Sequence, residues 1–173
     1  MTPRRRQRIR TARRRDGGAA LVEFALVVPV LLVLALGMVD FGKAFNYWID
    51  ETHLAAEGAR WAVVNKNPGS GDGLSLQQYV QQQGTTAELR NGGTASIAAP
   101  LQICIAFLTD SDDGTSGQVG DPVQVTATAT YAWLPFIAGS LSILDTTITA
   151  SATMRLEAVP SNYSAGCSGG GGP

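Results

Sequence analysis

The strongest constraint on this chain is an apolar run of 21 residues, residues 19–39, in which Glu23 is the only charged residue. As an α-helix this run spans about 30 Å, which is the thickness of the hydrocarbon core of a bilayer. Arginines occupy positions 13–15 directly before the run, whereas Asp40 and Lys43 follow it. By the positive-inside rule, we expect a single-pass cell-membrane protein with a cytoplasmic N-terminus and an extracytoplasmic C-terminal domain.

The basic residues are concentrated at the N-terminus, where eight of the 13 Lys and Arg residues fall within the first 15 positions. After a cut behind Gly18, the rest of the chain would keep five basic residues against 13 acidic ones. An arginine-rich tail is also typical of nucleic-acid-binding segments. Because an apolar run follows so closely, we instead expect the arginines to hold the N-terminus in the cytoplasm, with no nucleic acid as a partner.

Three fates are open to the apolar run. A secretory signal peptide needs a short apolar region and a small-residue cleavage site, for which Ala-Leu-Gly at 35–37 is a poor match. An uncleaved anchor explains the length but gives no purpose to Glu23. The carboxylate would lie near the cytoplasmic interface, where the cost of roughly 3 kcal/mol for an acidic group at the bilayer centre is reduced. The third fate is cleavage on the cytoplasmic side, before the run, which leaves the helix in the mature protein.

The residues around this third cleavage position resemble a prepilin-peptidase site. In type IV pilin-like proteins a basic leader ends in glycine, and glutamate occupies the fifth mature position. Here Gly18 is followed by Ala19, and Glu23 stands fifth after the cut with Phe24 next to it. The string GAALVEFALVVPVLLVLALGMVDFG, which starts at Gly18, resembles the TadE-like family of minor pilins in tight-adherence (Flp-type) pilus systems.

Two later segments resemble the same family, EGAR at 57–60 and TTITASATMRLE at 146–157. The resemblance implies a subunit of a tight-adherence type IV pilus that is not an enzyme and needs no cofactor. Its processing residues would be Gly18, Ala19, Glu23 and Phe24. Its partners would be membrane lipid, the prepilin peptidase, other pilins or pseudopilins, and the pilus assembly platform.

The resemblance also gives Glu23 a role in assembly. Cleavage after Gly18 would create an amino group on Ala19, about one helical turn from the Glu23 carboxylate. In pilin-like families this glutamate is held to pair with the N-terminus of a neighbouring subunit. A buried pair of this kind specifies register more than it adds stability.

Two hypotheses from other classes remain beside the minor pilin. One is an uncleaved, membrane-anchored exported binding or sensor domain, and the other is a secreted enzyme released by signal peptidase. The mature N-terminus separates them, because a pilin would start at Ala19, an anchored domain at Met1 and a secreted enzyme near Met38.

We expect an α+β fold, in which a long N-terminal helix packs on a small antiparallel β-sheet in the manner of pilins. The helix is predicted over residues 19–64, amphipathic from residue 40, and two helices with a break near Gly42 are the alternative. A turn at 65–71 ends it. The remaining predicted elements are a short helix at 74–83 and alternating strands at 96–108, 123–133 and 147–157.

These patterns divide the chain into four parts. The expected parts are a basic leader at 1–18, a transmembrane helix at 19–39, an extracytoplasmic pilin-like domain at 40–160 that begins with the amphipathic helix at 40–64, and a flexible Gly/Ser-rich tail at 161–173.

Other candidate sites carry weaker signals. The only histidine, His53, is expected to be a solvated helix residue rather than a catalytic one. The acidic segment DSDDG at 110–114 lacks the later glutamate of an EF-hand loop, so a polar turn is favoured and no metal is expected. Outside the cytoplasm, Cys104 and Cys167 form either a disulfide or one buried and one free thiol.

Overall fold

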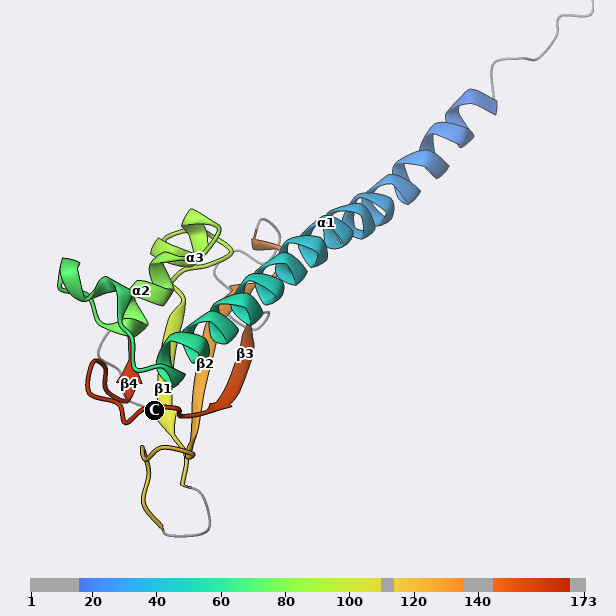
Figure 1. The fold of residues 1–173 in the computed structure, drawn as a ribbon. Coiled ribbons are helices and arrows are strands. Elements are labelled where there is room, and N and C mark those ends of the chain that lie inside the picture. The colour runs from blue at the N-terminus through green and yellow to red at the C-terminus, as the bar shows by residue number, and fades with distance from the viewer. Residues whose placement is uncertain (1–15, 110–113, 136–144, 169–173) are drawn as a thin grey trace, which may run out of the picture. The chain divides into compact units, whose positions relative to one another are not determined.

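The computed structural model describes residues 16–109, 114–135 and 145–168. It contains a long helix and a small antiparallel sheet (Figure 1), which confirms the α+β fold. The helices are α1 (Asp16–Val63), the 3₁₀ helix η1 (Pro68–Asp72), α2 (Leu76–Gln82) and α3 (Ala87–Asn91). The strands are β1 (Gln102–Phe107), β2 (Pro122–Ala132), β3 (Asp145–Arg155) and β4 (Gly166–Cys167). The chain divides into two compact units between Val39 and Asp40.

Helix α1 runs through both units without a break, so the alternative of two helices separated near Gly42 is wrong. It begins at Asp16 and ends at Val63, close to the predicted bounds, and Pro29 lies inside it. In the first unit its apolar side chains are exposed. Among the described residues, this one helix is long and apolar enough to cross a membrane, with a mean hydropathy of 2.7 in its most apolar stretch.

The C-terminus of α1 is closed by Asn65, whose φ of 49° lies in the left-handed region. The N–H of Asn65 bonds the carbonyl of Ala62, and the N–H of Lys66 bonds the carbonyl of Trp61, each at 3.0 Å. This pair of bonds is a Schellman motif, in which asparagine tolerates the left-handed conformation that glycine usually takes. The predicted stop signal therefore acts through a defined backbone cap.

The sheet of the second unit has the strand order β3-β2-β1-β4, and every neighbouring pair is antiparallel. Strand β2 alternates strictly. Of the residues that the alternation predicts to point inward, five are almost fully buried: Val123, Val125, Ala127, Ala129 and Tyr131. The sixth, Trp133, follows the end of the strand and is half-buried. The register pairs Pro122 with Arg155 and Ala132 with Asp145, so β3 follows β2 along its whole length. Because β3 is an edge strand, the residues that its alternation predicts to point inward are covered less completely. They are Ile148, Ala150, Ala152 and Met154, and of these only Ala150 is buried.

From Asp40 onward, α1 lies across one face of this sheet (Figure 1). Its buried side chains are mostly small, which allows a close approach to the strands: Ala44, Ala55, Ala59 and Ala62. Gly58 marks the closest approach, because a Cβ there would stand 3.0 Å from a methyl group of Val125 and 3.4 Å from one of Val80. Helices α2 and α3 complete the core with Leu76, Val80 and Leu89.

Two short helices were not predicted, and two predicted elements are shorter than expected. Helix α3 and the 3₁₀ helix η1 each have five residues, too few to show a helical period. Helix α2 begins later than predicted because Ser75 caps it, with reciprocal bonds between Ser75 and Gln78. Strand β1 begins at Gln102 rather than 96, since Leu101 donates its N–H to Leu89 of α3 instead of to a strand.

The C-terminal segment corrects the predicted flexible tail over residues 161–168. Gly166 and Cys167 form β4 against β1, and Cys167 is joined to Cys104 by a disulfide of 2.04 Å. Around it, the side chain of Gln77 donates to the carbonyls of Ser164 and Gly166. The Gly/Ser composition favoured disorder, but strand pairing and a covalent link hold this segment; residues 169–173 lie outside the described residues.

Candidate functional site

The four predicted processing residues all lie in the first turns of α1. Gly18, Ala19, Glu23 and Phe24 are exposed, and Phe24 retains 68% of its accessible surface. Gly18 has open space around the position that a Cβ would take. This segment is therefore a surface-exposed stretch of helix in the first unit, available to a peptidase, a lipid phase or another subunit.

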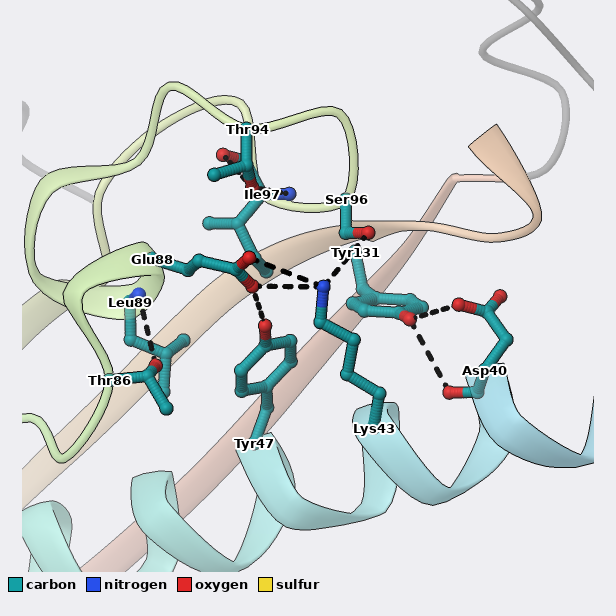
Figure 2. A network of polar contacts seen from close by, with 10 residues as sticks. All are labelled: Asp40, Lys43, Tyr47, Thr86, Glu88, Leu89, Thr94, Ser96, Ile97 and Tyr131. Atoms are coloured by element: carbon teal, nitrogen blue, oxygen red, sulfur yellow. Dashed lines mark hydrogen bonds and ion pairs between the residues drawn. The ribbon is translucent and has the colours of Figure 1, made fainter. Parts of the chain in front are cut away.

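A second arrangement lies where α1 enters the second unit, and we call it the junction cluster: Asp40, Lys43, Tyr47, Glu88, Ser96 and Tyr131. Three of its members come from successive turns of α1, one from α3, one from the loop before β1 and one from β2 (Figure 2). The cluster thus joins the helix to three separate parts of the domain.

Asp40 connects α1 to the end of β2. Its carboxylate accepts a hydrogen bond from the hydroxyl of Tyr131 and another from the N–H of Leu134, the latter at 2.8 Å (Figure 2 for Tyr131). Leu134 has a φ of 45°, which is unusual for a residue with a branched side chain, and the bond to Asp40 holds it there. Burial, together with the bond to Asp40 and its negative charge, raises the pKa of Tyr131.

Lys43 and Tyr47 connect α1 to α3. The ammonium of Lys43 lies 3.0 Å from the carboxylate of Glu88 and 3.4 Å from the hydroxyl of Ser96 (Figure 2). The hydroxyl of Tyr47 donates to the same carboxylate, and Lys43 also lies over the Tyr47 ring. Because Lys43 and Glu88 are about one third exposed, this ion pair contributes no more than about 1 kcal/mol.

Asp50 and Glu51 are adjacent buried carboxyl groups with different surroundings. Asp50 accepts from both the N–H and the hydroxyl of Thr85, at 2.8 Å and 2.6 Å. Glu51 is 0% exposed, and within the described residues neither of its carboxyl oxygens has a hydrogen-bond partner. Burial, with a smaller effect of the Asp50 charge, raises the pKa of Glu51 to about 8. Glu51 is therefore protonated at neutral pH.

The EGAR segment divides between two environments. Gly58 and Ala59 face the sheet, whereas Glu57 and Arg60 are exposed on the opposite side of α1. Glu57 and Arg60 line a shallow surface depression of about 540 Å³ together with Trp61 and His53. His53 is exposed there, as predicted for a solvated helix residue. Gly58 and Ala59 thus have a structural role in packing, whereas Glu57 and Arg60 lie on the surface.

Residues 18–60 match the family model described as TadE-like protein. The chain carries a TadE-like segment. This match confirms the resemblance predicted from Gly18 through EGAR. Comparison with curated proteins and with solved structures found no match. The predicted likeness of residues 146–157 to the last strand of the family lies outside the matched range and stays a prediction.

The TadE-like segment contains the processing residues, the whole apolar run and three members of the junction cluster. The junction cluster and the burial of Glu51 were not predicted from the sequence. The one signal for them is that charged residues stand among aromatic ones at 40–51. Among the described residues, no group of three or more His, Cys, Asp or Glu side chains is arranged to hold a metal. Most of the acidic segment at 110–114 lies outside them, since the description resumes at Gly114.

Proposed function

We propose that this protein is a minor pilin or pseudopilin of a tight-adherence type IV pilus system, and that it acts as an assembly part rather than an enzyme. The observation that carries the proposal is the TadE-like match, which begins at Gly18, the residue after which the leader would be cut. The same segment forms a helix apolar enough to cross a membrane. Motif, helix and family match thus coincide on one stretch of chain.

In this proposal the chain is inserted with its N-terminus in the cytoplasm, and the basic leader at 1–18 remains there. A prepilin peptidase cuts between Gly18 and Ala19, so that Ala19 gains a free, positively charged amino group. The helix at 19–39 stays in the membrane, and the domain that begins at residue 40 lies outside. The pilus assembly platform and other pilins or pseudopilins are the partners at the next step.

Glu23 is the proposed docking group for that step. Its carboxylate pairs with the N-terminal amine of a neighbouring subunit when the helix leaves the lipid for the fibre. An unpaired carboxylate in apolar surroundings is unfavourable. A neighbouring subunit displaced by one helical turn would lose the ion pair and leave the Glu23 carboxylate unpaired. Glu23 therefore selects the register of neighbouring helices.

The junction cluster fits a structural role beside this assembly site. Asp40 and Glu88 are already bound by Tyr131, Leu134, Lys43 and Tyr47, which leaves no free acid–base pair in the cluster. Its bonds fix the entry of α1 into the domain. We propose that the cluster keeps the part of α1 from Asp40 onward attached to α3, the loop before β1 and β2 while the subunit is moved.

N-terminal sequencing of the full-length protein, extracted from membranes of cells that contain the prepilin peptidase, tests the proposal. A mature start at Ala19 supports it, and the variant Gly18→Leu should retain Met1. A wild-type start at Met1 would instead indicate an uncleaved anchored binding or sensor domain, and a start near Met38 a secreted protein. Gly37→Leu is the matched control, because it alters the apolar run without touching the cut.

A further inference from the structure

The peptide bond at the proposed cut, between Gly18 and Ala19, lies inside α1. The helix begins at Asp16, so this bond falls in its first turn. In an α-helix the carbonyl of Gly18 accepts a bond from the N–H four residues later, that of Val22. Hydrolysis adds water at the carbonyl carbon of Gly18 and breaks the bond to Ala19, which leaves a carboxylate on Gly18 and an amine on Ala19. Because the helical turn engages this carbonyl, the turn must unwind before a peptidase can bind the bond in an extended form.

Two features make this turn the easiest part of α1 to unwind. The first N–H groups of a helix, here those of residues 16–18, have no acceptor within the helix. Gly17 and Gly18 both lie in this turn, and glycine lowers helix stability more than any residue except proline. In the proposed insertion, opening is limited on the other side by the apolar run, because lipid cannot bond the released backbone groups. The segment that opens is therefore short and contains the cut.

The folded helix does not require the glycines of this turn. A Cβ at Gly18 would meet no atom within 4 Å, whereas Gly58 is required by its close approach to Val125 and Gly73 by its φ of 71°. Gly17 has the right-handed helical backbone that any residue can adopt. Gly18 belongs to the motif that resembles a prepilin-peptidase site, but Gly17 stands outside it. The unwound form of the turn, not the helical one, gives a reason for a second glycine.

We propose that Gly17 is a positioning residue for cleavage, which weakens the first turn of α1 so that the bond after Gly18 unwinds into the peptidase. This inference rests on the proposed function, because it takes the cut after Gly18 as given. When a segment opens and closes faster than it is cut, the rate of cleavage follows the population of the open form. Alanine at position 17 stabilises the helix and should lower that population about fourfold.

Cleavage of the detergent-solubilised full chain by purified prepilin peptidase tests the inference. The initial rates of Gly17→Ala and Gly17→Val are compared with wild type. Valine is larger than alanine but a poorer helix former, and it does not cap a helix, so the two variants separate unwinding from side-chain size. In Gly17→Ala/Ala20→Gly a new glycine weakens the same turn again. Gly37→Ala is the matched control, because it makes the same change in α1, with open space around the methyl group, far from the cut.

We expect Gly17→Ala to be cut about fourfold more slowly than wild type, Gly17→Val at an intermediate rate, and the double variant and Gly37→Ala at about the wild-type rate. Without peptidase, amide hydrogen exchange at residues 20–22 should slow in the same order.

Three results would overturn the role of Gly17 while leaving the cut after Gly18 intact. They are a wild-type rate for Gly17→Ala, a slower cut for Gly17→Val than for Gly17→Ala, and unchanged amide exchange in a slowly cut Gly17→Ala protein. Wild-type protein that is not cut after Gly18 would instead reject the proposed function, and this inference with it.

Discussion

The hydroxyl of Tyr131 donates to the carboxylate of Asp40, a residue 91 positions earlier in the chain. The bond ties the first residue of the second unit to the C-terminal end of β2. Since Asp40 also holds the backbone of Leu134, one carboxylate fixes both the start of the domain and the exit from its central strand.

Removal of either partner of this bond should therefore destabilise the domain. Tyr131→Phe leaves one oxygen of Asp40 unpaired, and Asp40→Asn also weakens the bond to Leu134. We expect a loss of about 1–3 kcal/mol for each, and a double variant that loses less than the sum. Urea unfolding of the detergent-solubilised full chain measures this. The carboxyl-to-amide control is Glu157→Gln, at an exposed residue, and an equal loss there would contradict the assignment.

The pKa of Glu51 predicts how stability depends on pH. Its folded pKa of about 8 lies above the ordinary value of 4.5, so the folded state binds a proton that the unfolded state has released between these pH values. Stability should accordingly fall as the pH rises from 4.5 to 8, by up to about 1.4 kcal/mol per pH unit from this group. Above pH 8 the loss is complete.

Glu51→Gln removes the titrating group at almost constant volume. We expect the variant to be more stable than wild type at pH 8 and to lose most of the slope between pH 5 and 8. Unfolding curves at several pH values measure both effects. Glu57→Gln, an exposed glutamate on the same helix, should leave the slope unchanged. A Glu51→Gln protein with the wild-type slope would show that another group is responsible.

Gly58 should be intolerant of substitution because of its close approach to Val125 and Val80. Alanine gains about 1 kcal/mol of helix propensity, but its methyl group must displace β-branched core side chains, at a cost of about 1–3 kcal/mol. We expect Gly58→Ala to lower the unfolding free energy by about 1 kcal/mol. The control is Gly42→Ala, where no atom lies within 4 Å of the new methyl group and stability should rise. A more stable Gly58→Ala protein would show that the core yields without strain.

The role proposed for Glu23 predicts a separation of processing from assembly. Glu23→Gln keeps the size of the side chain but not its charge, so we expect normal membrane insertion and a sharp loss of incorporation into pili. Immunoblots of sheared pilus fractions, with membrane fractions as reference, measure this. Glu57→Gln again serves as the control, and unchanged incorporation of the Glu23 variant would refute the docking role.

The predictions from sequence succeeded where a repeating pattern reports a local environment. Strand β2 is flanked by strands on both sides and packed on one face, so its period-two pattern gave its inward residues correctly. The long helix was predicted because apolar residues continue from the membrane run into the domain. Residues 18–60 also carried the family resemblance that the comparison confirmed.

The predictions failed where a residue depends on a distant partner. Nothing near Asp40 in the sequence indicates Tyr131, and nothing near Glu51 shows that it is buried without a hydrogen bond. Residues 161–168 were predicted to be flexible because their composition is polar and rich in Gly and Ser. Their order comes from Cys104 and Gln77, far away in the chain. Such long-range pairing leaves no periodic signal.

The disulfide between Cys104 and Cys167 closes a covalent ring of the chain, with a sequence separation of 63. Strands β2 and β3 lie entirely within this ring. A protease that cuts the backbone once anywhere inside it therefore produces two chains that remain one molecule, and the helix keeps its sheet. Loops within the ring can therefore be nicked without separating the sheet from α1.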